Sequence, residues 1–240
     1  MELLEKTAAP SREELKAISD SLEDKTPEEI LRWAIETYHP KLTMATAFGA
    51  EGCALLAMLS QIEPNGRSVR VFNLETGYQF PETLELRERI REQYGITVEY
   101  VRAEESVEAM ERRFGGPIYG TNPDECCRIR KIEPLKRAVA GYDAWISAIR
   151  RDQTAVRANA GIVEWDAKFS LVKINPLANW TKQDVWTYIY INEVPYNPLH
   201  DRGYPSIGCW PCTRAVQAGE DDRAGRWSQL VKIECGLHTR

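Results

Sequence analysis

Six cysteines supply most of the reactive chemistry in this sequence, and five of them fall in three places. Cys126 and Cys127 are adjacent, Cys209 and Cys212 are separated by Trp-Pro, and Cys235 stands near the end of the chain. The first two groups offer four thiolates, which is the supply that a four-cysteine zinc or iron–sulfur site needs. Adjacent side chains on a helix diverge by about 100°, so they suit separate corners of a cluster better than one ion. The sequence therefore predicts a metal centre and favours a cubane iron–sulfur cluster.

Two simpler interpretations of these cysteines stay open at this point. A structural zinc site would use the same four thiolates, and the segment Cys209-Trp-Pro-Cys212 superficially resembles a redox-active dithiol. The dithiol interpretation leaves Cys126 and Cys127 without a role. Cys53 lies in an apolar helical run, where a cysteine is usually a small core residue, so it is assigned no role.

Cys235 is set apart from the other cysteines, in the segment Glu-Cys-Gly-Leu-His that ends at His238. A glycine beside a thiol in a terminal segment lets the thiol move, so it could attack a substrate in one position and present an adduct to a partner in another. Spacing alone supports an idle terminal cysteine equally well. Both interpretations stay open from the residues themselves.

Three short segments have the composition of anion-binding loops. Residues 46–52 (TAFGAEG) lie between an expected strand and an expected helix, where glycines and helix N-terminal amides can hold a phosphate or sulfate. Residues 74–77 and 150–154 follow later strands, and the second of these begins with two arginines, which fork well onto anionic oxygens. Paired arginines are often only a solvated surface. The absence of a Gly-Lys-Ser/Thr and of a G-x-G-x-x-G pattern argues against a P-loop nucleotidase and a nicotinamide enzyme.

The hydrophobic pattern predicts an α/β fold with a mostly parallel twisted sheet flanked by helices. Strands are expected at residues 42–47, 69–74, 96–101, 144–149, 162–165 and 169–174, and helices at 51–62, 81–94, 107–114, 126–140 and 181–192. Two capped helices are expected before residue 41, with Ser11 and Thr26 as N-caps. We expect N-terminal helices within residues 1–40, a core of 41–225 and a tail of 226–240. Loops at strand ends would bind the ligand.

Charge and composition restrict the partners. The formal net charge of −5 argues against nucleic acid, whereas residues 112–159 carry ten Lys or Arg against five Asp or Glu. This local excess suggests a small anionic ligand. No run of eighteen apolar residues and no signal-peptide core are present, so no membrane contact is expected and the location is expected to be cytoplasmic.

Taken together, these motifs resemble the assimilatory adenylyl-sulfate reductases, which belong to the sulfonucleotide reductase family and are related to ATP pyrophosphatases. The resemblance runs from about residue 42 to residue 238. It is carried by residues 46–52, 74–77 with 80–83 (FPET), 126–131 (CCRIRK), 150–154, 209–212 (CWPC) and 234–238 (ECGLH). It implies an adenine nucleotide alpha hydrolase-like fold and a place in sulfate assimilation and cysteine biosynthesis.

The resemblance also implies roles for individual residues. Cys126, Cys127, Cys209 and Cys212 would hold a [4Fe–4S] cluster, and Cys235 would attack adenylyl sulfate to leave a cysteine S-sulfonate. Thioredoxin or glutaredoxin would then release sulfite. The residues expected to bind the substrate are Thr46, Phe48, Gly49, Leu74, Glu75, Thr76, Gly77, Lys131, Arg150, Arg151, Arg223, Arg226 and His238. Of these, Lys131 would lie near both cluster and sulfate, and Arg223 and Arg226 would contact the anionic end of the substrate.

Departures from the family pattern keep other functions in view. Thr46 and Ala47 stand where related proteins often carry serines, Glu75 stands where aspartate is frequent, and the Ser-Gly-Gly-x-Asp-Ser loop of ATP pyrophosphatases is missing. The alternatives are a phosphoadenylyl-sulfate reductase or dual-specificity enzyme, a tRNA-thiolating ATP pyrophosphatase, and a zinc-stabilised binding module. The sequence leaves the oligomeric state open, including a homo-oligomer.

Overall fold

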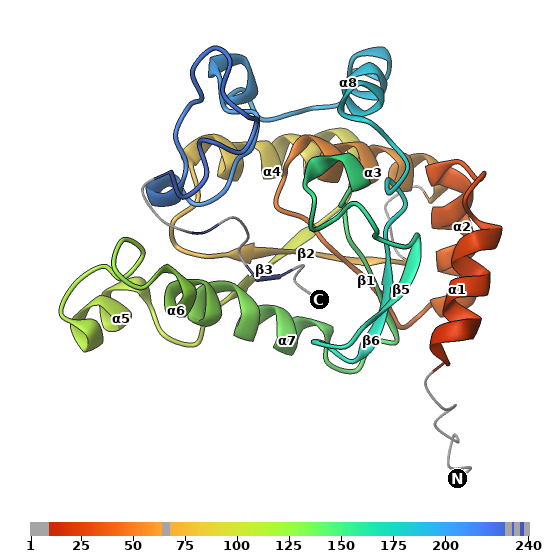
Figure 1. Cartoon of the computed structure of the whole chain (residues 1–240), viewed down its shortest axis with the longest axis horizontal. Helices are drawn as coiled ribbons and strands as arrows, with labels where there is room; N and C mark the ends of the chain where they lie inside the picture. Colours follow the sequence, from red (N-terminus) through yellow and green to blue (C-terminus); the bar gives the residue numbers. More distant parts are fainter. Residues whose placement is uncertain (1–9, 64–67, 229–231, 233–235, 238–240) are drawn as a thin grey trace, which may run out of the picture.

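A six-stranded sheet lies between two layers of helices in the computed structural model, which describes residues 10–63, 68–228, 232 and 236–237. Figure 1 shows α3 and α4 on one face of the sheet and α6 and α7 on the other. The strands are β1 (Leu42–Ala45), β2 (Arg70–Glu75), β3 (Val98–Arg102), β4 (Ala144–Ile146), β5 (Val163–Asp166) and β6 (Leu171–Ile174). The helices are α1 (Arg12–Ser21), α2 (Pro27–Tyr38), α3 (Ala50–Ile62), α4 (Pro81–Tyr94), α5 (Val107–Phe114), α6 (Pro123–Cys127), α7 (Glu133–Val139) and α8 (Lys182–Ile191).

The strand order is β3-β2-β1-β4-β6-β5, and every neighbouring pair is parallel except β5 with β6. Met44 in the central strand β1 pairs with Val71 on one side and with Ile146 on the other. Parallel strands need both faces covered, because their crossover helices lie on the faces. The predicted mostly parallel sheet is confirmed.

The core forms around β1 and α3. Leu42 and Met44 are fully buried, and nine of the thirteen residues of α3 are buried between the sheet and other helices. Each buried Leu or Met side chain contributes about 2 kcal/mol through removal from water. Cys53 is fully buried in α3, and this burial raises the pKa of its thiol to about 12, so its assignment as a core residue is confirmed.

The prediction of one continuous α-helix over residues 126–140 is wrong at residues 128–132. The structure has α6, then a π-helical turn over Arg128–Ile132, then α7. In the turn the Glu133 N–H donates to the carbonyl of Arg128, five residues back. Pro134 has no N–H and cannot continue the ordinary hydrogen-bond ladder, which favours this change of register. The side chains after Cys127 consequently face other directions than a continuous α-helix would give them.

Two capping boxes begin α1 and α2, as the sequence predicts at Ser11 and Thr26. Helix α1 lies against β5, and α2 lies against α3. Among the described residues, no helix has the length and apolar character required to cross a membrane.

Replacing Thr26 by alanine should lower the free energy of unfolding by about 1 kcal/mol, the usual contribution of an N-cap side chain. Thr26 Oγ1 accepts a hydrogen bond from the Glu29 backbone N–H at 3.2 Å, and alanine removes this acceptor. Urea unfolding measures the difference. Thr26→Ser keeps the hydroxyl and should remain close to the original stability; equal losses in both variants would contradict the capping explanation.

Candidate functional site

A cavity of about 410 Å³ opens at the carboxyl ends of β1, β2 and β4. The chain proceeds from β1 to β2 and β3 on one side of the sheet, and β4 lies on the other side of β1. This change of direction creates the crevice where open α/β sheets bind ligands. The cavity volume is in the range of small-molecule sites.

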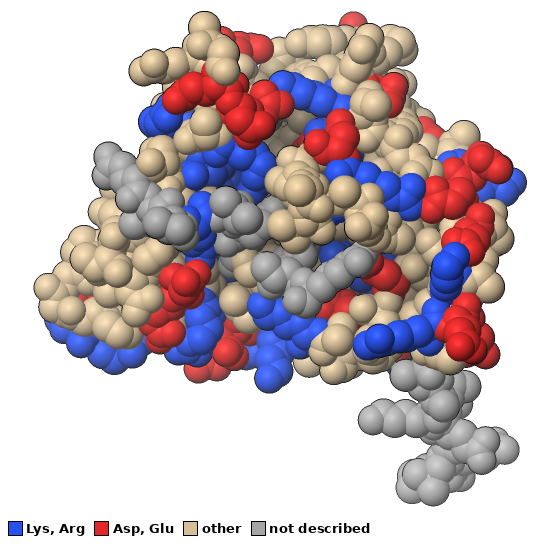
Figure 2. Space-filling model, in the orientation of Figure 1, with Lys and Arg blue, Asp and Glu red and all other residues tan. Residues whose placement is uncertain are grey.

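Eight of the residues expected to bind the substrate line this cavity. They are Thr46, Gly49, Leu74, Thr76, Lys131, Arg150, Arg223 and Arg226. Figure 2 shows Lys and Arg side chains gathered near the middle of the face seen in Figure 1, with acidic side chains beside them. The structure therefore brings together residues from loops separated by as much as 180 positions.

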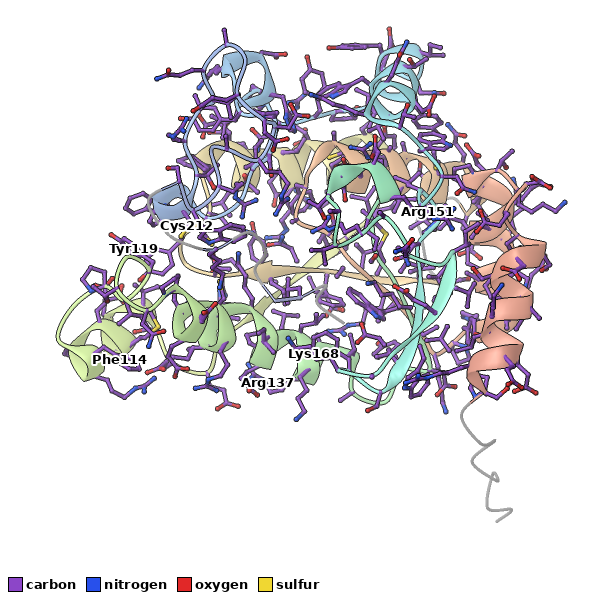
Figure 3. The ribbon with its side chains drawn as sticks, in the orientation of Figure 1. Phe114, Tyr119, Arg137, Arg151, Lys168 and Cys212 are labelled. Atoms are coloured by element: carbon purple, nitrogen blue, oxygen red, sulfur yellow. The ribbon has the colours of Figure 1, made fainter. Side chains whose placement is uncertain are left out.

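Four other residues expected to bind the substrate do not line the cavity: Phe48, Glu75, Gly77 and Arg151. Phe48 is 1% exposed and packs in the core, with a φ of 54°. Glu75 accepts the Gly77 N–H at 2.6 Å, so these two residues shape the turn that carries Thr76. Arg151 forms an ion pair with Glu23 at 2.6 Å, and Figure 3 shows it on the β5 side of the molecule, away from Cys212.

Two of the residues expected to act at the site, Cys235 and His238, lie outside the described residues. Their expected roles as nucleophile and substrate contact remain predictions.

The first loop is held in shape by Thr46. Its hydroxyl accepts the Phe48 N–H at 3.1 Å, and its carbonyl accepts from the Asn73 side chain at 2.8 Å. A Cβ on Gly52 would lie 2.7 Å from the Thr46 hydroxyl, so glycine is needed there. Gly49 caps α3 without a side-chain hydrogen bond. The N-terminal amides of α3 are therefore available beside the cavity, where the helix dipole favours an anion.

Arg150 is 5% exposed and already has carboxylate partners. Its Nε donates to Glu51 at 3.1 Å and Nη1 donates to Asp152, while Gln153 donates to the same Glu51 oxygen at 2.9 Å. This network compensates the charge of Arg150 and fixes the loop after β4. Arg150 therefore organises the cavity wall and brings little uncompensated positive charge to it.

Sequence reasoning missed several polar residues of the lining. They are Asn73, Gln79, Ser147, Gln153, Arg157, Lys182 and His200. Asn73 and Ser147 gave a usable signal, because each is polar and lies in or directly after a buried strand. Lys182 and His200 carry no such signal in the sequence, because they reach the cavity only through the packing of the segment that follows β6.

His200 is the most unusual of these missed residues. Its ring lies 5.1 Å from that of Trp186, nearly perpendicular to it. Burial lowers the pKa of its imidazole, while Glu51 and the Tyr204 backbone act in the opposite direction. A neutral imidazole there offers one donor and one acceptor to a ligand.

The four predicted cluster ligands line one small pocket beside the cavity: Cys126, Cys127, Cys209 and Cys212. Burial, and then the neighbouring thiols, raise the pKa of Cys126 to about 12, while Lys131 lowers it. Burial likewise raises the pKa of Cys212. Among the described residues, no three His, Cys, Asp or Glu side chains are arranged to hold one metal ion. The four thiols therefore share the lining of one pocket.

The cysteine pocket and the cavity share a wall made of Cys209, Lys131 and Trp227. Thr76 Oγ1 lies 3.3 Å from the Cys209 sulfur, which connects the turn after β2 to the cysteines. Arg130, 4% exposed, donates through Nε to the Thr76 carbonyl at 2.7 Å. Its Nη1 donates to the Glu105 carbonyl, also at 2.7 Å, so Arg130 ties two loops to the π-helical turn.

Arg226 reaches the cavity from the segment after residue 212. Its guanidinium lies 4.5 Å from the centre of the Trp227 ring and donates to the Ser206 hydroxyl at 3.3 Å. Its buried Nε has no hydrogen-bond partner among the described residues. A Cβ on Gly208 would lie 2.2 Å from Nη2, so Gly208 leaves the space that the guanidinium occupies. Arg226 therefore retains a donor for an anion.

Comparison with known proteins gives several extensive matches. A phosphoadenosine 5'-phosphosulfate reductase of Gloeobacter violaceus is 46% identical, with 93% of each chain covered. An adenosine 5'-phosphosulfate reductase of Halalkalibacterium halodurans is 43% identical over 93% of this chain and 96% of that protein. Adenosine 5'-phosphosulfate reductase 2 of Bacillus subtilis is 46% identical, again with 93% of each covered.

Solved structures agree with this result. A phosphoadenylyl-sulfate reductase from Candida auris, in a phosphate complex, is 32% identical with a TM-score of 0.77, covering 87% of this chain and 100% of that chain. An FMN adenylyltransferase of Candida glabrata, 13% identical with a TM-score of 0.54, covers 85% of this chain and 73% of that chain and shares the fold alone. Residues 41–215 match the family described as phosphoadenosine phosphosulfate reductase domain, and the chain belongs to that family.

Proposed function

We propose that this protein reduces adenylyl sulfate to sulfite and adenosine monophosphate in sulfate assimilation, with Cys235 as nucleophile and a thioredoxin or glutaredoxin as electron donor. The observation that carries the proposal is the wall of Cys209, Lys131 and Trp227, which joins a nucleotide-sized cavity to a four-cysteine pocket in a chain of this family. The reaction suits the cytoplasm, where such dithiols are kept reduced.

The chemistry has two transfers. The Cys235 thiolate attacks the sulfur of the sulfate group, a sulfur–sulfur bond forms, and adenosine monophosphate leaves with the electron pair of the broken S–O bond. A donor thiolate then attacks the Cys235 sulfur, and sulfite leaves with the electron pair of the sulfur–sulfur bond. The second donor thiol resolves the mixed disulfide. The dithiol loses two electrons and the sulfur gains two.

The cationic residues of the cavity account for substrate capture and leaving-group stabilisation. Lys131, Arg223 and Arg226 line the cavity, and Arg226 keeps an unused buried donor among the described residues. Fixed cations stabilise the negative charge that moves onto the leaving phosphate. The N-terminus of α3 lines the same cavity and adds backbone donors there.

A [4Fe–4S] cluster is the group that this donor set fits best. Cys126, Cys127, Cys209 and Cys212 would hold it, because all four line one pocket in a chain of this family, and four cysteine thiolates are the usual ligands of such a cluster. When bound, the cluster supplies local electrostatic tuning of the sulfate-binding residues.

Phosphoadenylyl sulfate is the second candidate substrate. A relative in Gloeobacter violaceus and a solved structure from Candida auris carry names for reductases of that nucleotide. The four cysteines favour adenylyl sulfate, as the family resemblance implies. Anaerobic sulfite release with thioredoxin, measured as kcat/KM for each nucleotide, separates the two; a higher value for phosphoadenylyl sulfate would reverse the assignment.

Anaerobically purified protein should be brown and contain about four irons and four sulfides per chain. Cys126→Ala and Cys212→Ala should lose iron, because each removes a proposed ligand. Iron and acid-labile sulfide assays measure this. Cys53→Ala is the matched control and should keep the iron, since Cys53 lies in the core cluster around α3. Stoichiometric zinc in iron-replete preparations would contradict the cluster.

Replacing Arg226 or Arg223 by alanine should weaken capture of adenylyl sulfate by about 1.5–3 kcal/mol, the scale for a hydrogen bond to a charged group. The measured quantity is kcat/KM. Arg214→Ala removes a nearby arginine that instead pairs with Glu220 at 2.8 Å, and it should leave kcat/KM unchanged. Unchanged kcat/KM in both Arg223→Ala and Arg226→Ala would show that these two arginines do not bind the substrate.

Mixing the enzyme with adenylyl sulfate, without a thiol donor, should give about one adenosine monophosphate per site and a protein heavier by one sulfonate. Mass spectrometry of the intact chain and of its Cys235 peptide checks the result. A dithiol should then release sulfite and restore the original mass. Cys235→Ser should keep its iron and lose adduct and turnover. Turnover of this variant near the original rate would exclude the mechanism.

A further inference from the structure

Ser147 lies directly after β4 and lines the cavity, although its side chain is almost completely buried. The residue is 1% exposed. Side chains alternate along a strand, so Ser147 faces the same side of the sheet as Trp145. Trp145 packs against Leu135 of α7 on that side, and both of these side chains line the cavity as well. A hydroxyl buried at such a place needs a hydrogen-bond partner.

The partner of Ser147 is Asn175, which follows the neighbouring strand β6. Ile146 pairs with Ile174, so the next residue of each strand lies opposite the other. The Ser147 hydroxyl donates to Asn175 Oδ1 at 2.5 Å, and Asn175 is fully buried. One side-chain hydrogen bond therefore joins the ends of two parallel strands beside the cavity.

The remaining contacts of the Asn175 amide fix the direction of this hydrogen bond. Nδ2 donates to the Gly161 carbonyl at 2.8 Å and to the Glu164 carboxylate at 3.3 Å. An amide turned the other way would place its oxygen against both of these acceptors, so Oδ1 has to face Ser147. An amide oxygen accepts and cannot donate. The hydroxyl hydrogen of Ser147 is therefore committed to Asn175.

A buried cation supports the Glu164 carboxylate. Lys173 lies opposite Glu164 in the β5–β6 pair, and its Nζ is 3.3 Å from Glu164 Oε1. The same ammonium lies 5.8 Å from the centre of the Trp145 ring, and the Lys173 side chain is 7% exposed. Glu164 is thereby held as an acceptor, which keeps the Asn175 amide in its orientation.

Ser147 consequently presents lone pairs, and no hydrogen, to a ligand in the cavity. A hydroxyl has one hydrogen and two lone pairs, and the hydrogen of Ser147 is already used. Turning it toward a ligand would leave the buried Asn175 oxygen without a donor, which is unfavourable. The ligand group that meets Ser147 must therefore be a hydrogen-bond donor.

The surface beside Ser147 is apolar and suits a flat base. Ala45 and Leu74 pack with Leu135 and Trp145 in one cluster, and all four residues line the cavity. Small-molecule sites commonly combine such an apolar surface with a few fixed polar groups that set the orientation of the ligand. One fixed acceptor beside an apolar surface fits a nucleobase that carries an amino group.

We propose that Ser147, oriented by Asn175, is a specificity-determining residue that accepts a hydrogen bond from the exocyclic 6-amino group of adenine. The inference rests on the proposed function, which supplies an adenine nucleotide as the substrate. A 6-oxo purine would place an oxygen at the same point, where two acceptors would face each other without a hydrogen between them. A site built to pair one polar group rejects an analogue that leaves its own buried group unpaired.

The test is the ratio of the dissociation constants for inosine and adenosine monophosphate, measured by anaerobic calorimetry on the iron-loaded enzyme. The original protein should prefer adenosine monophosphate by about tenfold or more, and Ser147→Ala should reduce the preference to about threefold or less. Ser147→Thr keeps the hydroxyl and should retain the preference. Ser60→Ala is the matched control, because the Ser60 hydroxyl donates to the Ala57 carbonyl at 2.7 Å and Ser60 does not line the cavity.

A second variant tests the positioning role of Asn175. Asn175→Ala frees the hydrogen of Ser147, so the hydroxyl can donate to a 6-oxo group, and the affinity for inosine monophosphate should rise about threefold. A role in stability alone would weaken both nucleotides together. Thermal unfolding checks that each variant is folded, and Ser147→Ala decides the proposal by itself where Asn175→Ala does not fold.

The outcomes separate this inference from the proposed function. An original protein that neither binds adenosine monophosphate nor releases sulfite from adenylyl sulfate overturns the proposed function. Sulfite release together with equal nucleotide preferences in the original protein and Ser147→Ala overturns the role of Ser147 alone. A variant that instead loses its discrimination between adenosine monophosphate and the 2'-deoxy form also overturns it, since Ser147 would then contact the ribose.

Discussion

The reversal of strand order between β1 and β4 is the constraint on which the site depends. Because β1, β2 and β4 are parallel, their carboxyl ends meet at one edge, and the chain leaves them in opposite directions. The crevice between the departing loops is the cavity. Helices cover both faces of the parallel strands, so a ligand can reach the sheet mainly at the strand ends. Thr46, Thr76 and Arg150 occupy those ends.

Periodicity and caps predicted the elements well, because these signals are local. Helix α4 starts with Pro81 and ends at Gly95 in a left-handed conformation, and its predicted limits match the structure. The π-helical turn escaped prediction because Pro134, whose missing N–H favours the change of register, was taken as part of one continuous helix. The adjacent Arg150 and Arg151 were grouped by sequence, yet one faces the cavity and the other pairs with Glu23. Backbone direction after β4 decides this, and no pattern of residue types encodes it.

Lys131, in the wall between the two pockets, acts electrostatically on both the cysteines and the cavity. Buried thiols resist ionisation, as the raised pKa of Cys126 shows, and a nearby positive charge favours their thiolate form. Lys131 lowers the pKa of Cys126 and also lines the cavity, so one ammonium serves both the cysteines and an anionic ligand. Negative charge placed in the cavity would therefore act on the same ammonium as the cysteines. Through Lys131, the ionisation of the cysteine pocket and the charge in the cavity are coupled.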